Sequence, residues 1–277
     1  MTNIDKNRAP KSRVTARSRE AQQDPTRSAG LRRGLEILGL FSDAKPEWGI
    51  TEVARELGVL KSQIHRAIKT LEDMRYLRRD PSTRRYCLGF KAFEIGTCAG
   101  RQTNRMLWVR LYLKRLAHKL DATVSLRLKD DIDLLVVDII EGTDDPSSHL
   151  PQGARVPLNY GAGGQVLAAS YPDQKVIAII RKHGLPRYTL KSLTKPSDFL
   201  AAVQRVRRQG YAISMGETVP GSFSVAAPIT SAEGNLAAVL VAARPLKGMS
   251  QARIEQFTAA VVETAARISS EQKQHQT

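Results

Sequence analysis

The residues best suited to chemistry form a basic, polar run at helical spacing. At about 100° per residue, Ile64, Ile68 and Leu71 fall on one face of a helix. The outward face presents Ser62, Arg66 and Lys69, flanked by Gln63 and His65, and Lys61 begins the helix. Cations pair with phosphates, while hydroxyl, amide and guanidinium groups hydrogen-bond to base edges. We therefore expect this face to contact double-stranded DNA.

A second basic group follows directly in the chain. Residues 76–79 and 84–88 are short extended runs, and the Asp-Pro-Ser-Thr turn between them predicts a hairpin. Arg84 and Arg85 lie at its tip and are candidates for contacts with the phosphate backbone. From residue 61 to residue 85 there are eight basic side chains and three acidic ones. This excess favours a polyanionic partner.

Two further helices must hold the basic helix in place. Apolar residues recur at helical spacing over residues 31–41, which predicts an amphipathic helix. Thr51 is a suitable N-cap for a short second helix, which Gly58 can end in the left-handed conformation. The basic helix then runs from about residue 61 to residue 74. Helix, glycine-containing turn, basic helix and hairpin together predict a winged helix-turn-helix.

After residue 106 the pattern changes to strands and helices without a strict βαβ repeat. The expected strands are 123–128, 134–140, 211–214, 224–229 and 236–243, and the expected helices are 107–120, 166–170, 173–182, 196–209 and 251–269. This mixture predicts an α+β domain built on a curved antiparallel sheet.

A glycine-rich segment and several serines mark a candidate binding site in this second domain. Glycines let backbone N–H groups approach an anion closely at a helix N-terminus. The segment lacks the Lys-Ser/Thr pair of a P-loop, which favours a structural turn over a nucleotide site. The candidate effector-binding residues are Gly161, Ala162, Gly163, Gly164, Ser214, Glu217, Ser222, Ser224, Leu240 and Ala242.

Small polar groups on an apolar wall suit a compact amphiphilic metabolite, such as an aromatic or branched carboxylic acid. The alternative is that the serines only satisfy backbone groups at strand ends.

No pattern points to catalysis, a metal or a cofactor. A G-x-S-x-G motif is absent, and His149 and His183 lie far in sequence from Ser222 and Ser224. The five histidines show no H-x-x-x-H spacing, and two cysteines are too few for a disulfide framework or a zinc site. We expect no catalytic residue, no metal and no cofactor.

The whole chain is strongly basic. Its 277 residues include 43 Lys and Arg against 27 Asp and Glu, a net charge of +16, which attracts nucleic acid. The length predicts more than one domain: a disordered basic arm over 1–27, a DNA-binding domain over 28–90, a linker helix over 91–105 and an effector domain over 106–277. With no secretory signal and no apolar run of about 20 residues, we expect a cytoplasmic protein without membrane contact.

In order and spacing, these segments resemble the isocitrate-lyase-regulator (IclR) family of bacterial transcription factors. Residues 50–58 and 61–66 resemble the DNA-reading helices of the family, and residues 80–89 resemble its wing and the start of its linker. In the second domain, the resemblance rests on residues 155–158, 164–169, 210–213, Glu217, 219–221 and 226–229.

The resemblance implies a linker that dimerises, dimers or tetramers on palindromic operators, and a ligand-sensing C-terminal domain. The chain departs from the family at Gln165, where a lysine is usual, and at Ser224, where a cysteine is frequent. Leu240 and Ala242 stand where some members carry serines. Residues 214–216 are Ser-Met-Gly, where acidic residues are frequent in the family. Together these departures make the expected pocket less acidic and more apolar than in sensors of short keto acids.

The expected function is a ligand-responsive DNA-binding regulator whose partners are an operator, a small-molecule effector and further copies of itself. An alternative is a small-molecule-transforming enzyme with a basic N-terminal appendage. An RNA-binding module is a third option, which the aromatic content of 5% disfavours because readers of single-stranded RNA stack bases on aromatic side chains.

Overall fold

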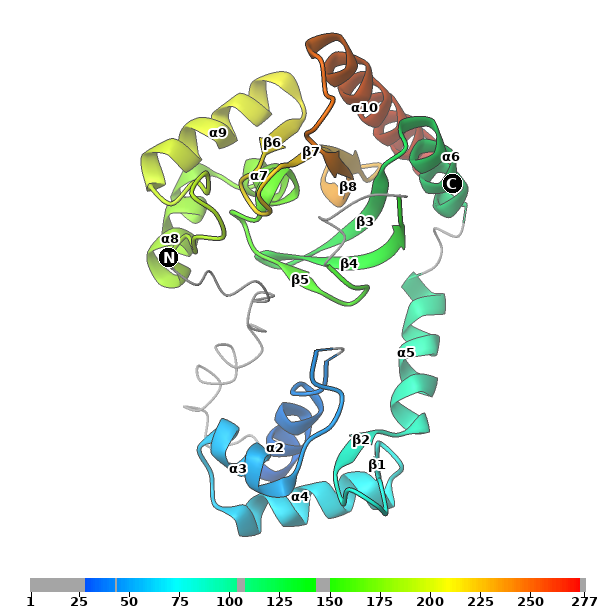
Figure 1. Ribbon diagram of the computed structural model, residues 1–277, viewed down its shortest axis with the longest axis vertical. Coiled ribbons are helices and arrows are strands. Elements are labelled where there is room, and N and C mark those ends of the chain that lie inside the picture. The colour runs from blue at the N-terminus through cyan, green and yellow to red at the C-terminus, as the bar shows by residue number, and fades with distance from the viewer. Residues whose placement is uncertain (1–27, 43, 104–107, 143–149, 275–277) are drawn as a thin grey trace. The chain divides into compact units, whose positions relative to one another are not determined.

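The computed structural model describes residues 28–42, 44–103, 108–142 and 150–274 (Figure 1). These residues divide into two compact units, one of residues up to 103 and one of residues from 108 onward. The predicted basic arm, residues 1–27, lies outside the described residues. We describe each unit by itself.

The N-terminal unit is a winged helix-turn-helix, as predicted. Its elements are α2 (Ala29–Leu38), α3 (Ile50–Leu57), α4 (Lys61–Asp73), β1 (Leu77–Arg79), β2 (Tyr86–Leu88) and α5 (Phe90–Thr103). The N-cap of α3 is Gly49 and not Thr51, because the carboxylate of Glu52 reaches back to accept the Gly49 N–H at 2.9 Å. Gly58 ends α3 with a φ of 66°, as expected for a left-handed cap.

The core of this unit fixes the wing against the helices. Ile64, Ile68 and Leu71 of α4 pack in one cluster with Trp48 and Tyr86. The backbones of Trp48 and Tyr86 exchange two hydrogen bonds of 2.9 Å, so the segment before α3 extends the β1–β2 hairpin. The wing and the basic helix therefore share one core.

The C-terminal unit is an α+β domain with an antiparallel sheet in the order β5-β4-β3-β8-β7-β6, which confirms the predicted fold class. Its strands are β3 (Thr123–Asp130), β4 (Asp133–Ile140), β5 (Arg155–Val156), β6 (Ala212–Met215), β7 (Ser222–Thr230) and β8 (Leu236–Pro245). Its helices are α6 (Val109–Leu120), α7 (Gly161–Ala169), α8 (Asp173–His183), α9 (Pro196–Gln209) and α10 (Gln251–Gln274). None of the described helices is both long and apolar enough to span a membrane.

The two faces of the six-stranded sheet have different neighbours. On one face Phe223 of β7 packs against Phe257 of α10, with ring centroids 5.2 Å apart, and α6 lies beside α10 (Figure 1). On the other face Val239 and Val241 of β8 share a buried cluster with α7, α8 and α9. Because side chains alternate along a strand, each residue of the sheet faces one group of helices or the other.

Helix α7 begins five residues earlier than the sequence analysis expects. Gly161, which the sequence predicts to lie in a turn, opens the first turn of this helix. A Cβ at Gly164 would lie 2.2 Å from the carbonyl oxygen of Leu158, so only glycine lets the helix pack this closely against that segment. Burial of the whole turn outweighs the low helix propensity of glycine.

Candidate DNA-binding and effector-binding sites

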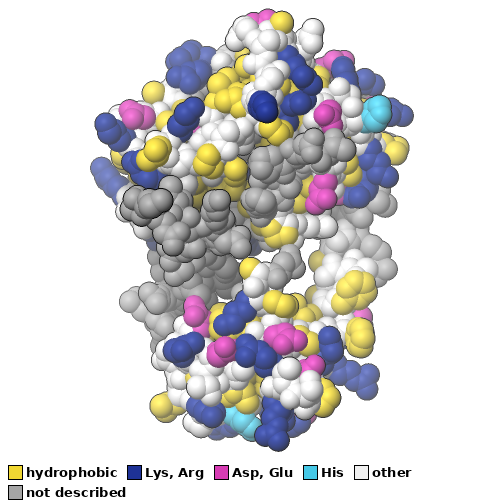
Figure 2. Space-filling view, in the orientation of Figure 1, with side chains coloured by type: hydrophobic (Ala, Val, Ile, Leu, Met, Phe, Trp, Pro, Cys, Tyr) yellow, Lys and Arg dark blue, Asp and Glu magenta, His cyan; other side chains and the backbone are white. Residues whose placement is uncertain are grey.

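The outer face of α4 presents the predicted polar residues to solvent. Lys61, Ser62, Gln63, His65, Arg66 and Lys69 are all exposed, whereas Ile64 and Ile68 are at most 1% exposed. In Figure 2, Lys and Arg side chains stand on either side of the histidine of this unit. The helix therefore pairs a fixed apolar side with a face able to bind bases and phosphates.

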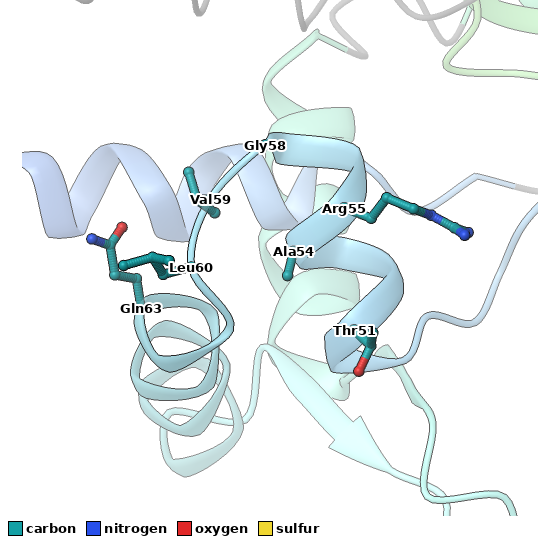
Figure 3. Close-up of a pocket in the computed structure, with 7 residues that line it drawn as sticks. All are labelled: Thr51, Ala54, Arg55, Gly58, Val59, Leu60 and Gln63. Carbon is teal, nitrogen blue, oxygen red and sulfur yellow. The ribbon is translucent and has the colours of Figure 1, made fainter.

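The junction of α3 and α4 adds donors that the sequence analysis did not identify. A groove of about 650 Å³ is lined by Thr51, Ala54, Arg55, Gly58, Val59, Leu60 and Gln63 (Figure 3). Leu60, 70% exposed, precedes α4 beside Gln63, while Thr51 and Arg55 lie on α3. Arg55 is exposed on the polar side of an amphipathic helix, and that position is the signal that could have indicated it.

A carboxylate shapes the tip of the wing. Asp80 accepts hydrogen bonds from the backbone N–H groups of Ser82 and Thr83, at 2.7 and 2.9 Å, and from the Ser82 hydroxyl at 2.5 Å. These bonds to the ionised form, that from the hydroxyl first, lower the pKa of Asp80 to about 2. The turn leaves Arg84 exposed, with a φ of 57°.

Two of the cations predicted to contact DNA form ion pairs within the protein. Arg85 pairs with Glu52 at 2.6 Å and donates to the carbonyl oxygen of Glu47 at 3.2 Å, so it ties the wing to the start of α3. Lys69 pairs with Glu72 at 3.3 Å and with Asp73 at 3.0 Å. Among the described residues no such pair involves the remaining cations, which are Lys61, Arg66 and Arg84.

In the C-terminal unit, the first turn of α7 meets the end of β6. The Ser214 hydroxyl oxygen lies 3.6 Å from the position that a Cβ on Gly161 would take. Glu217 accepts a hydrogen bond of 2.8 Å from the Gln165 side chain. Burial raises the pKa of the Glu217 carboxyl, while hydrogen bonds from Ser214 and Gln165 oppose that shift. The structure thus brings the glycine turn, Ser214 and Glu217 together.

The predicted serines of β7 divide into two kinds. Ser224 lies opposite Ser214 in the register of β6 and β7, on the face that carries α7. The Ser222 hydroxyl instead donates to the carbonyl oxygen of Val219 at 2.7 Å. Ser222 therefore fits the alternative role of satisfying backbone at a strand end.

The expectation that Leu240 and Ala242 line this site is wrong. Leu240 pairs in register with Leu126 and Ala227, and its neighbour Val241 contacts α7 from the opposite side of the strand. Strand alternation therefore turns Leu240 and Ala242 towards the α10 face. The apolar wall beside the glycine turn is formed by Val239 and Val241.

Arg127, which is not among the predicted site residues, also lies beside the first turn of α7. This β3 residue is 8% exposed, and its Nη1 lies 3.0 Å from the position that a Cβ on Gly163 would take. Its Nε donates to the Ser125 hydroxyl at 3.1 Å. The signal for it is a single arginine inside an otherwise apolar strand pattern, on the same face as Ser125.

No group of three or more His, Cys, Asp or Glu side chains in the described part of the chain is arranged to hold a metal ion.

Two family models match the chain. The model described as the IclR helix-turn-helix domain matches residues 30–81, and the model of the bacterial transcriptional regulator IclR C-terminal region matches residues 105–270.

Two curated relatives match most of their own length. The HTH-type transcriptional regulator BhcR of Paracoccus denitrificans is 29% identical over 87% of this chain and 88% of its own. The transcriptional repressor IclR of Escherichia coli is 23% identical over 86% of this chain and 88% of its own. These relatives are transcriptional regulators and not enzymes, which overturns the alternative of an enzyme with a basic appendage.

Solved structures share the fold of the chain. An IclR transcriptional regulator from Alicyclobacillus acidocaldarius superposes with a TM-score of 0.77 at 26% identity, covering 89% of this chain and 99% of that one. An IclR homolog from Microbacterium hydrocarbonoxydans, complexed with 4-hydroxybenzoate, gives a TM-score of 0.75 at 21% identity, over 88% and 99% of the two chains.

Proposed function

This chain belongs to the IclR family of bacterial transcriptional regulators, and we propose that it binds palindromic operators as a dimer or tetramer. We further propose that a small organic acid, aromatic or branched, binds the C-terminal unit and changes the affinity for DNA. To act in this way, the effector must bind the DNA-competent and the incompetent states unequally, because equal affinity shifts no equilibrium.

The observation that carries the proposal is the exposed face of α4. Lys61, Gln63 and Arg66 stand on a helix whose opposite side is locked in the core, and no carboxylate among the described residues pairs with the two cations. A recognition helix needs this combination, since its donors must be rigidly placed and available to base edges. Arg84 on the wing supplies a cation for the phosphate backbone.

Exposed apolar side chains in the N-terminal unit support self-association. Leu31 and Leu35 of α2 are 67% and 60% exposed, and Phe90 and Phe93 of α5 are 78% and 73% exposed. Such residues gain free energy when a partner covers them. A two-fold dimer would match a palindrome, with half-sites centred about 34 Å apart or at a multiple of that distance.

The polar groups around the first turn of α7 support the effector class. Glycine N–H groups at a helix N-terminus suit a carboxylate, and Val239 and Val241 suit an apolar body. A structural neighbour was solved with 4-hydroxybenzoate, which is an acid of this kind.

The experiment is selection of genomic DNA fragments by the full-length protein, followed by footprinting with and without a panel of aromatic and branched acids. We expect a palindromic footprint whose affinity changes with one acid of the panel. Binding that is equally tight on random DNA of the same length would contradict operator recognition.

A further inference from the structure

Arg127 places an isolated positive charge inside the C-terminal unit. The residue is 8% exposed, and its Nε is held by the Ser125 hydroxyl. No carboxylate of the described residues forms an ion pair with it, and the one ionisable group there that influences its charge is the phenol of Tyr160. The two terminal nitrogens, Nη1 and Nη2, are the donors that remain.

The charge persists at neutral pH. Burial lowers the pKa of Arg127 to about 10, which is still well above 7, so the guanidinium stays protonated. A buried ion without a partner is costly, because it loses its hydration and gains no counter-charge. A side chain with a purely structural role would be expected to have such a counter-charge.

The surroundings add to the positive potential. Nη1 lies beside Gly163 in the first turn of α7, and no side chain caps that turn. A helix N-terminus carries a partial positive charge and presents free N–H groups. A cation and a helix N-terminus repel each other, so their juxtaposition favours an anion between or beside them.

Glu217, the acid beside the first turn of α7, does not supply that anion. Glu217 hydrogen-bonds with Gln165 and Ser214, and the cation that acts on its carboxyl is Arg205 and not Arg127. The other close neighbours of the Gly163 turn are apolar, namely Val241 and Leu134. Tyr160 and Tyr188 pack edge to face 4.9 Å apart, which adds aromatic surface next to the guanidinium.

We propose that Arg127 recognises the carboxylate of the effector, which the terminal nitrogens of the guanidinium and the first turn of α7 bind together. This inference rests on the proposed function, because it assumes an effector at this face of the sheet. A planar guanidinium fits a carboxylate with two parallel hydrogen bonds. One buried cation matches a monoanion, and the valines and tyrosines match an aromatic or branched body.

The first test needs no ligand. Arg127→Met keeps the length and apolar stem of the side chain and removes the charge, so the melting temperature of the full-length protein should stay equal or rise. If the arginine were a structural element, the same change would lower it. A clear fall in the melting temperature of the ligand-free variant therefore overturns the inference.

The second test measures binding by calorimetry, with benzoate and 2-methylpropanoate as probes and benzamide as the neutral counterpart of benzoate. We expect the wild-type chain to bind at least one of the acids and to bind benzamide more weakly. Arg127→Met should weaken binding of that acid about tenfold to a hundredfold, since a hydrogen bond to a charged group is lost. Arg127→Lys keeps the charge but not the two parallel hydrogen bonds, so its affinity for the acid should lie between those of the wild type and Arg127→Met.

The matched control is Arg244→Met, which changes an arginine of β8 that donates to the Leu120 carbonyl oxygen at 2.9 Å. Because Arg244 lies opposite Phe223 in register, it belongs to the α10 face, and its loss should leave acid binding unchanged. Equal binding of benzoate by wild type and Arg127→Met, or no binding of either acid by wild type, overturns the inference.

Operator binding separates this inference from the proposed function. Arg127→Met should bind the selected operator as the wild type does in the absence of acid. If the wild type binds no operator, the proposed function fails. If the variant binds the operator and still responds to the acid, only the role of Arg127 fails.

Discussion

At the scale of single residues, side chains of the same charge differ in whether a carboxylate of the protein already pairs with them. Arg66 and Lys69 both lie on the exposed face of α4, but Lys69 is held by Glu72 and Asp73. The sequence predicts which residues share the face, because helical periodicity is regular. The sequence does not predict which of these residues form ion pairs within the protein, because an ion pair depends on the rotamers of both side chains.

Arg66→Ala should weaken binding to the cognate operator by about 1–3 kcal/mol if the guanidinium forms two hydrogen bonds with one base. The loss should be confined to one position of the site. Lys69→Ala is the matched control and should have a smaller effect, since its charge is already paired. Titration of each variant against operators substituted one base pair at a time measures this. An equal loss on operator and random DNA would show that Arg66 contacts only phosphate.

The two neighbouring arginines of the wing should differ in the same way. Arg84→Ala should reduce the slope of log affinity against log salt by about 0.9, the value for one phosphate contact. Arg85→Ala should leave that slope nearly unchanged and lower the free energy of unfolding instead, because it breaks the link to Glu52 and Glu47. Salt titrations and urea denaturation distinguish the two. Identical slopes for both variants would refute the division of roles.

At the scale of elements, the sequence predicts those whose local preferences agree with the fold. Helix α9 spans Pro196–Gln209, the predicted range, because proline starts it and Gly210 ends it with a φ of 83°. The first turn of helix α7 is not predicted to be helical because its glycines are poor helix formers. The reason for Gly164 is a close contact with residues 157–158 that no local pattern records. Local sequence also fails to predict which side of the sheet Leu240 faces, because that depends on the register of its strand with the neighbouring strands.

Gly164→Ala should therefore destabilise the C-terminal unit by about 1–3 kcal/mol, the usual cost of overfilling a packed interior. The added Cβ meets the backbone of Leu158, which cannot turn away as a side chain could. Gly30→Ala is the control: a Cβ there has open space, so the N-terminal unit should keep its stability or gain slightly. Chemical denaturation of both variants measures the effect. An unchanged C-terminal transition in Gly164→Ala would mean that the helix can shift away.

At the scale of the whole molecule, the chain has a net charge of +16 and two compact units. The charge suggests DNA binding, and the sheet domain suggests binding of a small molecule. Composition alone indicates a polyanionic partner, and the order of motifs indicates the two-domain plan. Assembly is a different matter. The sequence shows that Phe90 and Phe93 are apolar, but only the structure shows that they lie exposed on α5.

Replacing Phe90 and Phe93 together with serine should convert the protein to a monomer, because these two side chains, on the helix expected to dimerise, are more exposed than Leu31 and Leu35 and offer a second copy the larger apolar surface. A monomer contacts only one half-site. In a dimer, by contrast, binding of one half-site holds the second DNA-binding domain at a high effective concentration near the other half-site. Operator affinity should then fall about 10²- to 10⁴-fold. Met74→Ser removes another apolar side chain of the same unit, which is 60% exposed, and should leave both assembly and affinity intact. Sedimentation velocity and operator titration test the two together. A double variant that stays dimeric and binds the palindrome at full strength would place the assembly surface elsewhere.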